Sequence, residues 1–101
     1  MRIQSLQQEI DQWVRAHGGY WSELSLLARL SEEVGELARV YNTRFGGKPV
    51  KPGEQVGDLE GELADVLWIV LCMANQQGVD LEAALERVMH KVRSRGQVTA
   101  G

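Results

Sequence analysis

The sequence has little of what several protein classes require. Its 101 residues include one cysteine, Cys72, and only two prolines. A single cysteine cannot form an internal disulfide, and its place in an apolar run indicates a small buried hydrophobe. No apolar run approaches the ~20 residues of a membrane-spanning helix, and the first residues show no signal core. We therefore expect a cytoplasmic protein with no membrane partner.

A basic excess is also missing. Eleven lysines and arginines stand against fourteen aspartates and glutamates, so the net charge is −3. Nucleic-acid-binding surfaces are usually basic, and we therefore expect no nucleic-acid partner. The hydrophobic content of 44% is ordinary for a globular protein and argues against disorder. The length suits one domain, which we place at residues 1–101.

The alternating pattern of β-strands is absent, and so are internal repeats. Apolar residues instead recur every three or four positions, which indicates amphipathic helices. Ser22 and Asp80 are suitable N-caps, and glycines follow three of the helical segments. The fold class is therefore all-α, as a helical bundle. The predicted helices are Ile3–Ala16, Ser22–Phe45, Gly57 or Asp58 to Gln77, and Leu81–Arg95, with a loop at 46–53 and a flexible tail at about 96–101.

Apolar residues on these helices predict which faces are buried. The third helix is apolar on nearly every side beyond Leu63, which indicates that another subunit covers part of it. The stripes predicted to face inward are Leu27, Leu30, Val34, Leu37, Tyr41 and Phe45 on the second helix, and Leu81, Ala84, Leu85 and Val88 on the fourth.

Two acidic clusters interrupt these helices. Glu32, Glu33 and Glu36 lie in the second helix, and Glu62 and Asp65 open the third. Acids three residues apart share one helix face, while Glu32 turns toward solvent. If the two helices face each other, four carboxylates converge, and we expect a site for Mg²⁺, with Mn²⁺ as an alternative. Gly35, between the acids, suggests the close approach of another backbone. The four converging acids are Glu33, Glu36, Glu62 and Asp65.

Other catalytic patterns are missing. A di-iron bundle needs a Glu-x-x-His pair on two helices, but Arg87 stands three residues before His90. Neither the Gly-x-Ser-x-Gly turn of serine hydrolases nor a phosphate-binding loop occurs. Hard-metal carboxylates in a small helical protein suit a phosphate substrate, because Mg²⁺ bridges phosphate oxygens. The residues alone thus indicate a divalent cation and a phosphate.

The pattern Glu32-Glu33-x-x-Glu36, followed by Glu62-x-x-Asp65, resembles the MazG-like nucleotide pyrophosphohydrolases of the all-α pyrophosphatase superfamily. The similarity continues in the segments 27–31, 41–46 and 87–91 and covers nearly the whole chain. It is greatest to the short single-domain type called YpjD-like. The resemblance implies a four-helix bundle-like MazG fold, assembled as a homodimer or homotetramer.

The resemblance also implies an activity: hydrolysis of a nucleoside triphosphate to the monophosphate and pyrophosphate, in a house-cleaning role toward non-canonical nucleotides. Carried over by position, Glu32 and Glu33 are the catalytic residues, with Glu32 positioning or deprotonating the attacking water. The metal ligands would be Glu33, Glu36, Glu62 and Asp65. Relatives often carry an asparagine after the last lysine, where this chain has Val92.

Basic and aromatic residues supply the other candidates for substrate contacts. Lys91 and Arg95 lie four apart on the last helix, and Lys48 and Lys51 lie in the glycine-proline loop; all four are candidates for the phosphate tail. Trp21 and Tyr20 precede the second helix and are candidates for base stacking. We assign Trp13 and Trp68 to packing.

Two alternatives remain open at this point. One is a phosphoribosyl-ATP pyrophosphohydrolase, whose acidic pattern is similar but whose flanking sequence differs. The other is a non-catalytic helical module that binds a nucleotide or a partner protein. Nucleotide-dependent stabilisation without turnover would indicate the binding module.

Overall fold

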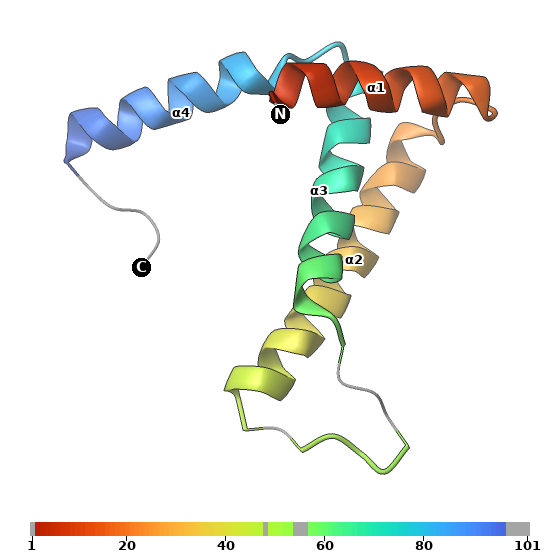
Figure 1. Ribbon diagram of the computed structural model, residues 1–101, viewed down its shortest axis with the longest axis vertical. Helices are drawn as coiled ribbons and strands as arrows, with labels where there is room; N and C mark the ends of the chain where they lie inside the picture. The colour runs from red at the N-terminus through yellow and green to blue at the C-terminus, as the bar shows by residue number, and fades with distance from the viewer. Residues whose placement is uncertain (1, 48, 54–56, 97–101) are drawn as a thin grey trace.

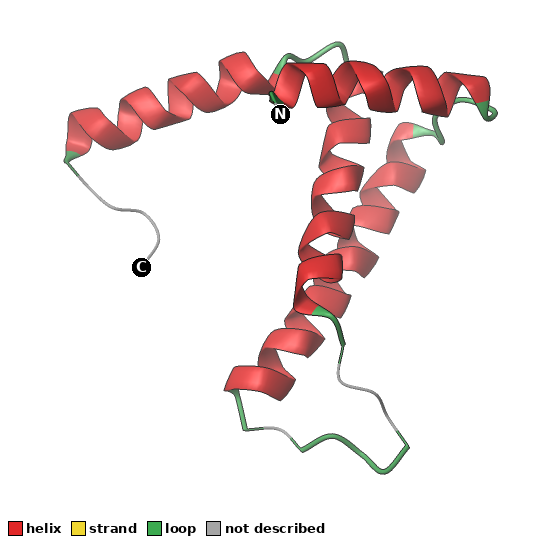
Figure 2. Ribbon diagram, viewed as in Figure 1, coloured by secondary structure: helices red, strands yellow, loops and turns green. Residues whose placement is uncertain are grey.

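Four α-helices make up the fold. The structure, a computed structural model, describes residues 2–47, 49–53 and 57–96. Over these residues the helices are α1 (Ile3–Ala16), α2 (Glu23–Phe45), α3 (Leu59–Gln76) and α4 (Leu81–Arg95), as Figure 1 shows. No strand occurs in this part of the chain (Figure 2). The all-helical fold class and the four predicted segments are confirmed, and beyond Gly96 the predicted tail lies outside the described residues.

The helix ends follow from local side-chain chemistry. The hydroxyl of Ser22 accepts a hydrogen bond from the backbone N–H of Ser25 (3.2 Å), and the carboxylate of Asp80 does the same for Ala83 (3.2 Å). Each bond satisfies an N–H that has no partner within its helix. The chain leaves α1 through Gly18, whose φ of +104° is a conformation that other residues rarely adopt.

The helices do not close into a compact bundle within one chain. α2 packs against α3, α1 crosses the end of this hairpin, and α4 contacts α1 and projects away (Figure 1). The radius of gyration is 16.5 Å, against about 13 Å for a compact domain of this length. The predicted inward face of α4 is confirmed only at its start, where Leu81 packs against the core cluster and Ala84 is partly buried. It is wrong for Leu85 and Val88 in the single chain, because they are 46% and 50% exposed.

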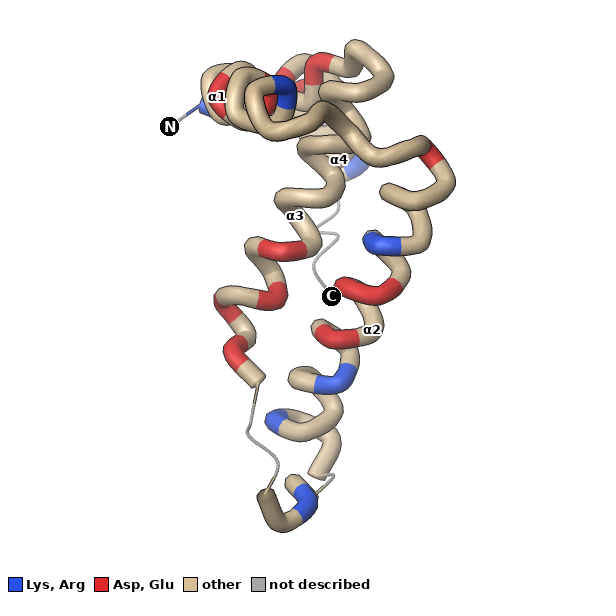
Figure 3. The backbone as a smooth tube through the Cα atoms, turned by 90° about the vertical axis from the view of Figure 1, so that its right-hand side faces the viewer, with Lys and Arg blue, Asp and Glu red and all other residues tan. Residues whose placement is uncertain are grey.

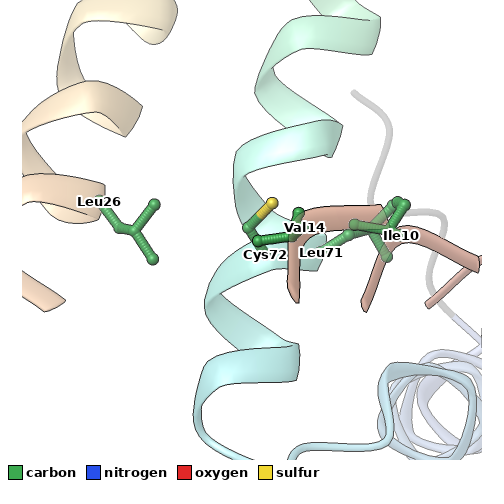
Figure 4. Packing of buried hydrophobic residues seen from close by; sticks show 5 residues of the cluster. All are labelled: Ile10, Val14, Leu26, Leu71 and Cys72. Atoms are coloured by element: carbon green, nitrogen blue, oxygen red, sulfur yellow. The ribbon is translucent and has the colours of Figure 1, made fainter. Parts of the chain in front are cut away.

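The hydrophobic core lies where α1 crosses the α2–α3 hairpin (Figure 4). Leu71 of α3 is 2% exposed and Cys72 is 3% exposed. This burial confirms the prediction that Cys72 is a small buried hydrophobe, and it raises the pKa of the thiol. The core residues drawn in Figure 4 are Ile10, Val14, Leu26, Leu71 and Cys72.

One buried polar side chain ties three parts of the chain together. Gln7 of α1 is 6% exposed. Its amide nitrogen donates to Asn75 Oδ1 (3.0 Å) and to the carbonyl of Val79 (2.8 Å). Its amide oxygen accepts from the backbone N–H of Leu81 (3.0 Å). Gln7 therefore joins α1 to α3 and to the start of α4, which sets the angle at which α1 crosses the hairpin.

The buried face of α2 differs from the predicted one. Leu26, Glu33 and Val40 are buried, each seven residues from the next, and they face the hairpin interior. Leu30 and Leu37 lie partly buried beside them. The other predicted residues form a second stripe that one chain leaves exposed. This outer stripe includes Leu27 (50% exposed), Val34 (47%), Tyr41 (47%) and Phe45 (69%).

Gly35 has no close neighbour in this chain. A Cβ added at Gly35 would meet no heavy atom within 4 Å among the described residues, apart from its own helix turn. The inferred close approach of another backbone is therefore wrong within the single chain. Separately, no described helix is both long and apolar enough to cross a membrane.

Candidate metal centre and adjoining cavity

Three of the predicted acids meet between α2 and α3. One carboxylate oxygen each from Glu33, Glu62 and Asp65 lies within 4.8 Å of the others. Glu33 faces α3 because it shares the buried face of α2 with Leu26 and Val40. Figure 3 shows the acids of the two helices at similar heights along the hairpin. An all-oxygen ligand set of this kind suits Mg²⁺, Mn²⁺ or Ca²⁺ better than soft metals.

The electrostatics of this cluster favour a cation. Loss of solvation raises the pKa of the Glu62 carboxyl above its usual value, and the neighbouring charges of Glu36, Asp65, Glu33 and Asp58 raise it further. Glu33 is only 9% exposed, and Arg29 Nε lies 3.0 Å from its Oε1. The Arg29 guanidinium pairs with Glu33, and a divalent cation bound among Glu33, Glu62 and Asp65 would neutralise their remaining negative charge.

The other two acids of α2 occupy different positions. Glu36 is exposed and lies outside the three-residue cluster, although it is close enough to raise the pKa of Glu62. The Glu32 side chain is 68% exposed and makes only a 3.7 Å ion pair with Arg29. The structure therefore brings together three of the four predicted metal ligands, with Glu36 nearby and Glu32 turned to solvent as expected.

An open cavity of about 300 Å³ adjoins the acids. It is lined by Glu33 and Asp65 and also by Trp13, Trp21 and Trp68, which are all the tryptophans of the chain. The Trp13 and Trp68 rings meet edge to face with centroids 6.2 Å apart. The sequence-based assignment of Trp13 and Trp68 to packing therefore overlooked their exposed surfaces, of 55% and 39%. Their spacing within amphipathic helices gave no signal of this.

The two aromatic residues singled out for stacking differ in their environments. Trp21 is 58% exposed and lines the cavity. Tyr20 also lines it, but the Tyr20 hydroxyl donates to Asp11 (2.6 Å) and the Arg15 guanidinium lies over its ring. Burial and the Asp11 bond raise the Tyr20 pKa to about 12. Trp21 thus has the more available ring for a ligand.

Of the predicted phosphate-binding cations, the three that the structure describes do not lie at the acids. Lys91 and Arg95 lie on α4, which projects away from the α2–α3 hairpin in Figure 1. Lys51 is exposed in the loop at the far end of that hairpin, and Lys48 lies outside the described residues. Among the described residues, Arg29 is the cation that lines the cavity, and nothing in the sequence pattern indicated this role.

Comparisons with known proteins agree on one family. Residues 21–98 match the model of the MazG nucleotide pyrophosphohydrolase domain. The chain is 44% identical over 94 residues to the uncharacterized protein YpjD of Bacillus subtilis strain 168, covering 92% of this chain and 85% of that protein. It is 38% identical over 64 residues to the Gene 37 protein of Mycobacterium phage L5, covering 62% of this chain and 56% of that protein.

Two crystal structures resemble the whole fold. The crystal structure of YPJD from Bacillus subtilis matches with a TM-score of 0.81 and 42% identity, covering 94% of this chain and 96% of that one. The Bacillus-conserved MazG protein, a nucleotide pyrophosphohydrolase, matches with a TM-score of 0.76 and 39% identity, covering 90% of this chain and 88% of that one. The open arrangement of the helices therefore recurs in experimental structures.

Proposed function

Because this chain belongs to the MazG nucleotide pyrophosphohydrolase family and is a hydrolase acting on nucleotides, we propose that it converts nucleoside triphosphates to monophosphate and pyrophosphate with Mg²⁺. The observation that carries this proposal is the convergence of Glu33, Glu62 and Asp65 within 4.8 Å. A polyphosphate would be repelled by these carboxylates alone. Cation binding makes the acidic cluster compatible with an anionic substrate.

Each residue of the site has a proposed role. Glu33, Glu62 and Asp65 hold the cation, and Glu36 adds negative charge beside them. A divalent cation bound there lowers the pKa of coordinated water and neutralises phosphate charge. Arg29 holds the Glu33 carboxylate in place. Glu32, whose carboxylate is exposed and only loosely paired, positions or deprotonates the attacking water.

We further propose that Trp21 stacks on the nucleobase, since its exposed ring lines the cavity next to the acids. Non-canonical nucleotides, as in a house-cleaning role, are proposed substrates. Lys91 and Arg95 could contact the phosphate tail only from another subunit, because α4 leaves its own hairpin (Figure 1).

The decisive assay is pyrophosphate release from a panel of canonical and modified ribo- and deoxyribonucleoside triphosphates, with Mg²⁺ or Mn²⁺. We expect monophosphate and pyrophosphate as products, no turnover with EDTA, and loss of turnover in Asp65→Asn with the helix content unchanged. Release of a nucleoside diphosphate and orthophosphate, instead of the monophosphate and pyrophosphate, would contradict the proposed reaction. Nucleotide-dependent thermal stabilisation without turnover would favour the non-catalytic binding module.

We also propose that the protein is a homo-oligomer, a dimer or tetramer, in which α2 pairs with a second copy. Its outer stripe follows the alternating three- and four-residue spacing of helix–helix seams. On α3, Leu63 and Leu67 are also exposed, by 46% and 45%. A monomer would leave this apolar surface in water. The α2 seam consists of Leu24, Leu27, Ser31, Val34, Ala38, Tyr41 and Phe45.

Light scattering after size-exclusion chromatography tests this assembly. Val34→Lys places a charge in the middle of the seam, and we expect it to shift the protein toward monomers, because an unpaired buried ammonium is costly. Gln12→Lys, at an exposed position of α1, is the matched control and should elute with the wild type. A wild-type mass equal to one chain at about 100 µM would contradict the proposal, since obligate interfaces assemble well below that concentration.

A further inference from the structure

The cavity beside the acids has two chemically different ends. Its acidic end is formed by Glu33 and Asp65, and its aromatic end by the last turn of α1 and the segment that follows it. Leu26 and Glu33 both line it and are seven residues apart on α2, which corresponds to about 10 Å along a helix. The cavity thus extends from the metal ligands to an aromatic wall over roughly the length of a nucleoside.

Two contacts hold the ring of His17 in this wall, although the residue is exposed. Its ring stacks on Trp13, with centroids 4.2 Å apart and planes 16° from parallel. Its Nδ1 lies 2.7 Å from the backbone carbonyl oxygen of Trp13. Because a carbonyl oxygen only accepts hydrogen bonds, Nδ1 carries the proton. In the neutral ring, Nε2 is therefore a hydrogen-bond acceptor, and it has no hydrogen-bond partner among the described residues.

We propose that this cavity binds the nucleobase and that His17 Nε2 accepts a hydrogen bond from an exocyclic amino group of that base. The inference rests on the proposed function, since the triphosphate must reach Glu33, Glu62 and Asp65. It makes His17 a specificity-determining residue. Cytosine and adenine present such an amino group, whereas uracil and hypoxanthine present a carbonyl oxygen at the same position.

The discrimination has a physical basis in the fixed tautomer. A carbonyl opposite Nε2 sets two acceptors against each other, and both lose their hydrogen bonds to water. An amino group at that position instead donates a hydrogen bond to Nε2, which compensates for the hydrogen bond that Nε2 loses to water. Sites that are built to hydrogen-bond a substrate group reject the analogue that lacks it. Because the stack on Trp13 and the bond to its carbonyl hold the ring, the imidazole cannot easily turn to offer an N–H instead.

Tryptophan fluorescence can measure this directly, because all three tryptophans of the chain line the cavity. We would titrate the protein with non-hydrolysable triphosphate analogues in the presence of Mg²⁺. The analogues form two pairs that differ in one exocyclic group: the cytidine against the uridine triphosphate analogue, and the adenosine against the inosine triphosphate analogue. The expected result is at least about tenfold tighter binding of the amino member of the pair that the cavity accommodates.

Two variants isolate the role of His17. His17→Phe keeps an aromatic ring against Trp13 but has no acceptor, and we expect the amino–keto preference to fall to within about twofold. His17→Gln offers either an amide oxygen or an amide nitrogen, so it should accept both members of a pair. His90→Phe is the matched control, because His90 is exposed on α4 and does not line the cavity; it should keep the wild-type preference.

The outcomes separate this inference from the proposed function. Turnover of triphosphates without an amino–keto preference, or with a preference that survives in His17→Phe, would overturn the inference and leave the pyrophosphohydrolase intact. The absence of turnover with a preserved His17-dependent binding preference would overturn the catalytic proposal alone. No fluorescence response to any analogue would overturn the placement of the base in this cavity.

Discussion

Replacing Glu62 by glutamine is expected to abolish pyrophosphate release and, at the same time, to stabilise the metal-free protein. The loss of activity follows from the loss of a carboxylate that contributes one of three converging oxygens. An amide is a poor ligand for Mg²⁺ beside two remaining acids, so we expect turnover to fall at least about a hundredfold.

The stabilisation follows from the raised pKa of Glu62. Burial and four neighbouring acids make the ionised form less favourable in the folded protein than in the unfolded chain. The ordinary pKa of a glutamate carboxyl is 4.5, and the pKa of Glu62 in the folded protein is higher. The stability that this carboxyl contributes is therefore fully present below pH 4.5 and is lost as the pH rises through the folded-state pKa. At neutral pH the metal-free wild type therefore carries a penalty that Glu62→Gln removes.

Thermal unfolding with EDTA and with Mg²⁺ separates these effects. We expect a higher midpoint for Glu62→Gln than for the wild type with EDTA, and a much smaller rise on adding Mg²⁺. Glu60→Gln is the matched control, because Glu60 lies in the same first turn of α3 but outside the acidic cluster. A lower midpoint for metal-free Glu62→Gln, or turnover within tenfold of the wild type, would contradict the assignment.

Replacing Gln7 by leucine is expected to lower the free energy of unfolding by about 2–4 kcal/mol. Leucine is apolar and similar in size, so the main effect is the loss of hydrogen bonds. Asn75 Oδ1, the Val79 carbonyl and the Leu81 N–H would all lose a partner. Total stabilities of small domains are about 5–15 kcal/mol, so this one substitution removes a large share.

Urea denaturation followed by circular dichroism measures this loss. Gln8→Leu is the matched control, since Gln8 is the exposed neighbour on α1, and its effect should stay within about 0.5 kcal/mol. Because α1 carries Trp13 to the cavity and His17 follows at its end, we also expect weaker quenching of tryptophan fluorescence by nucleotides in Gln7→Leu. Equal denaturation midpoints for Gln7→Leu and the wild type would show that these hydrogen bonds contribute little.

The positions of the helices could be predicted because their determinants are local. Ser22 and Asp80 act as caps in the structure as expected. The approach of α2 to α3 could also be anticipated, since acids on one face of each helix are consistent with a shared ligand. The sequence did not show that α4 would leave the hairpin, because its apolar face resembles that of a packed helix.

The candidate site could be predicted only in part. Glu33, Glu62 and Asp65 come together as expected, whereas Glu36 stands apart. Of the aromatic half, Tyr20 and Trp21 were expected near a ligand and do line the cavity, whereas the two tryptophans of α1 and α3 were not. Trp13 and Trp68 look like core residues in any helical pattern, and only the crossing of α1 over the hairpin makes them a cavity wall.

By itself, the sequence determined four helices, the helix faces that carry the acids, and a resemblance that the comparisons confirmed. These properties depend on periodicity and on short-range chemistry. Only the tertiary structure decided which of two apolar stripes on α2 faces α3, since Leu26 and Leu27 differ by one residue and about 100° of helix rotation. It also decided that Glu33, flanked by Leu26 and Val40 on the buried stripe, lies against Glu62 and Asp65.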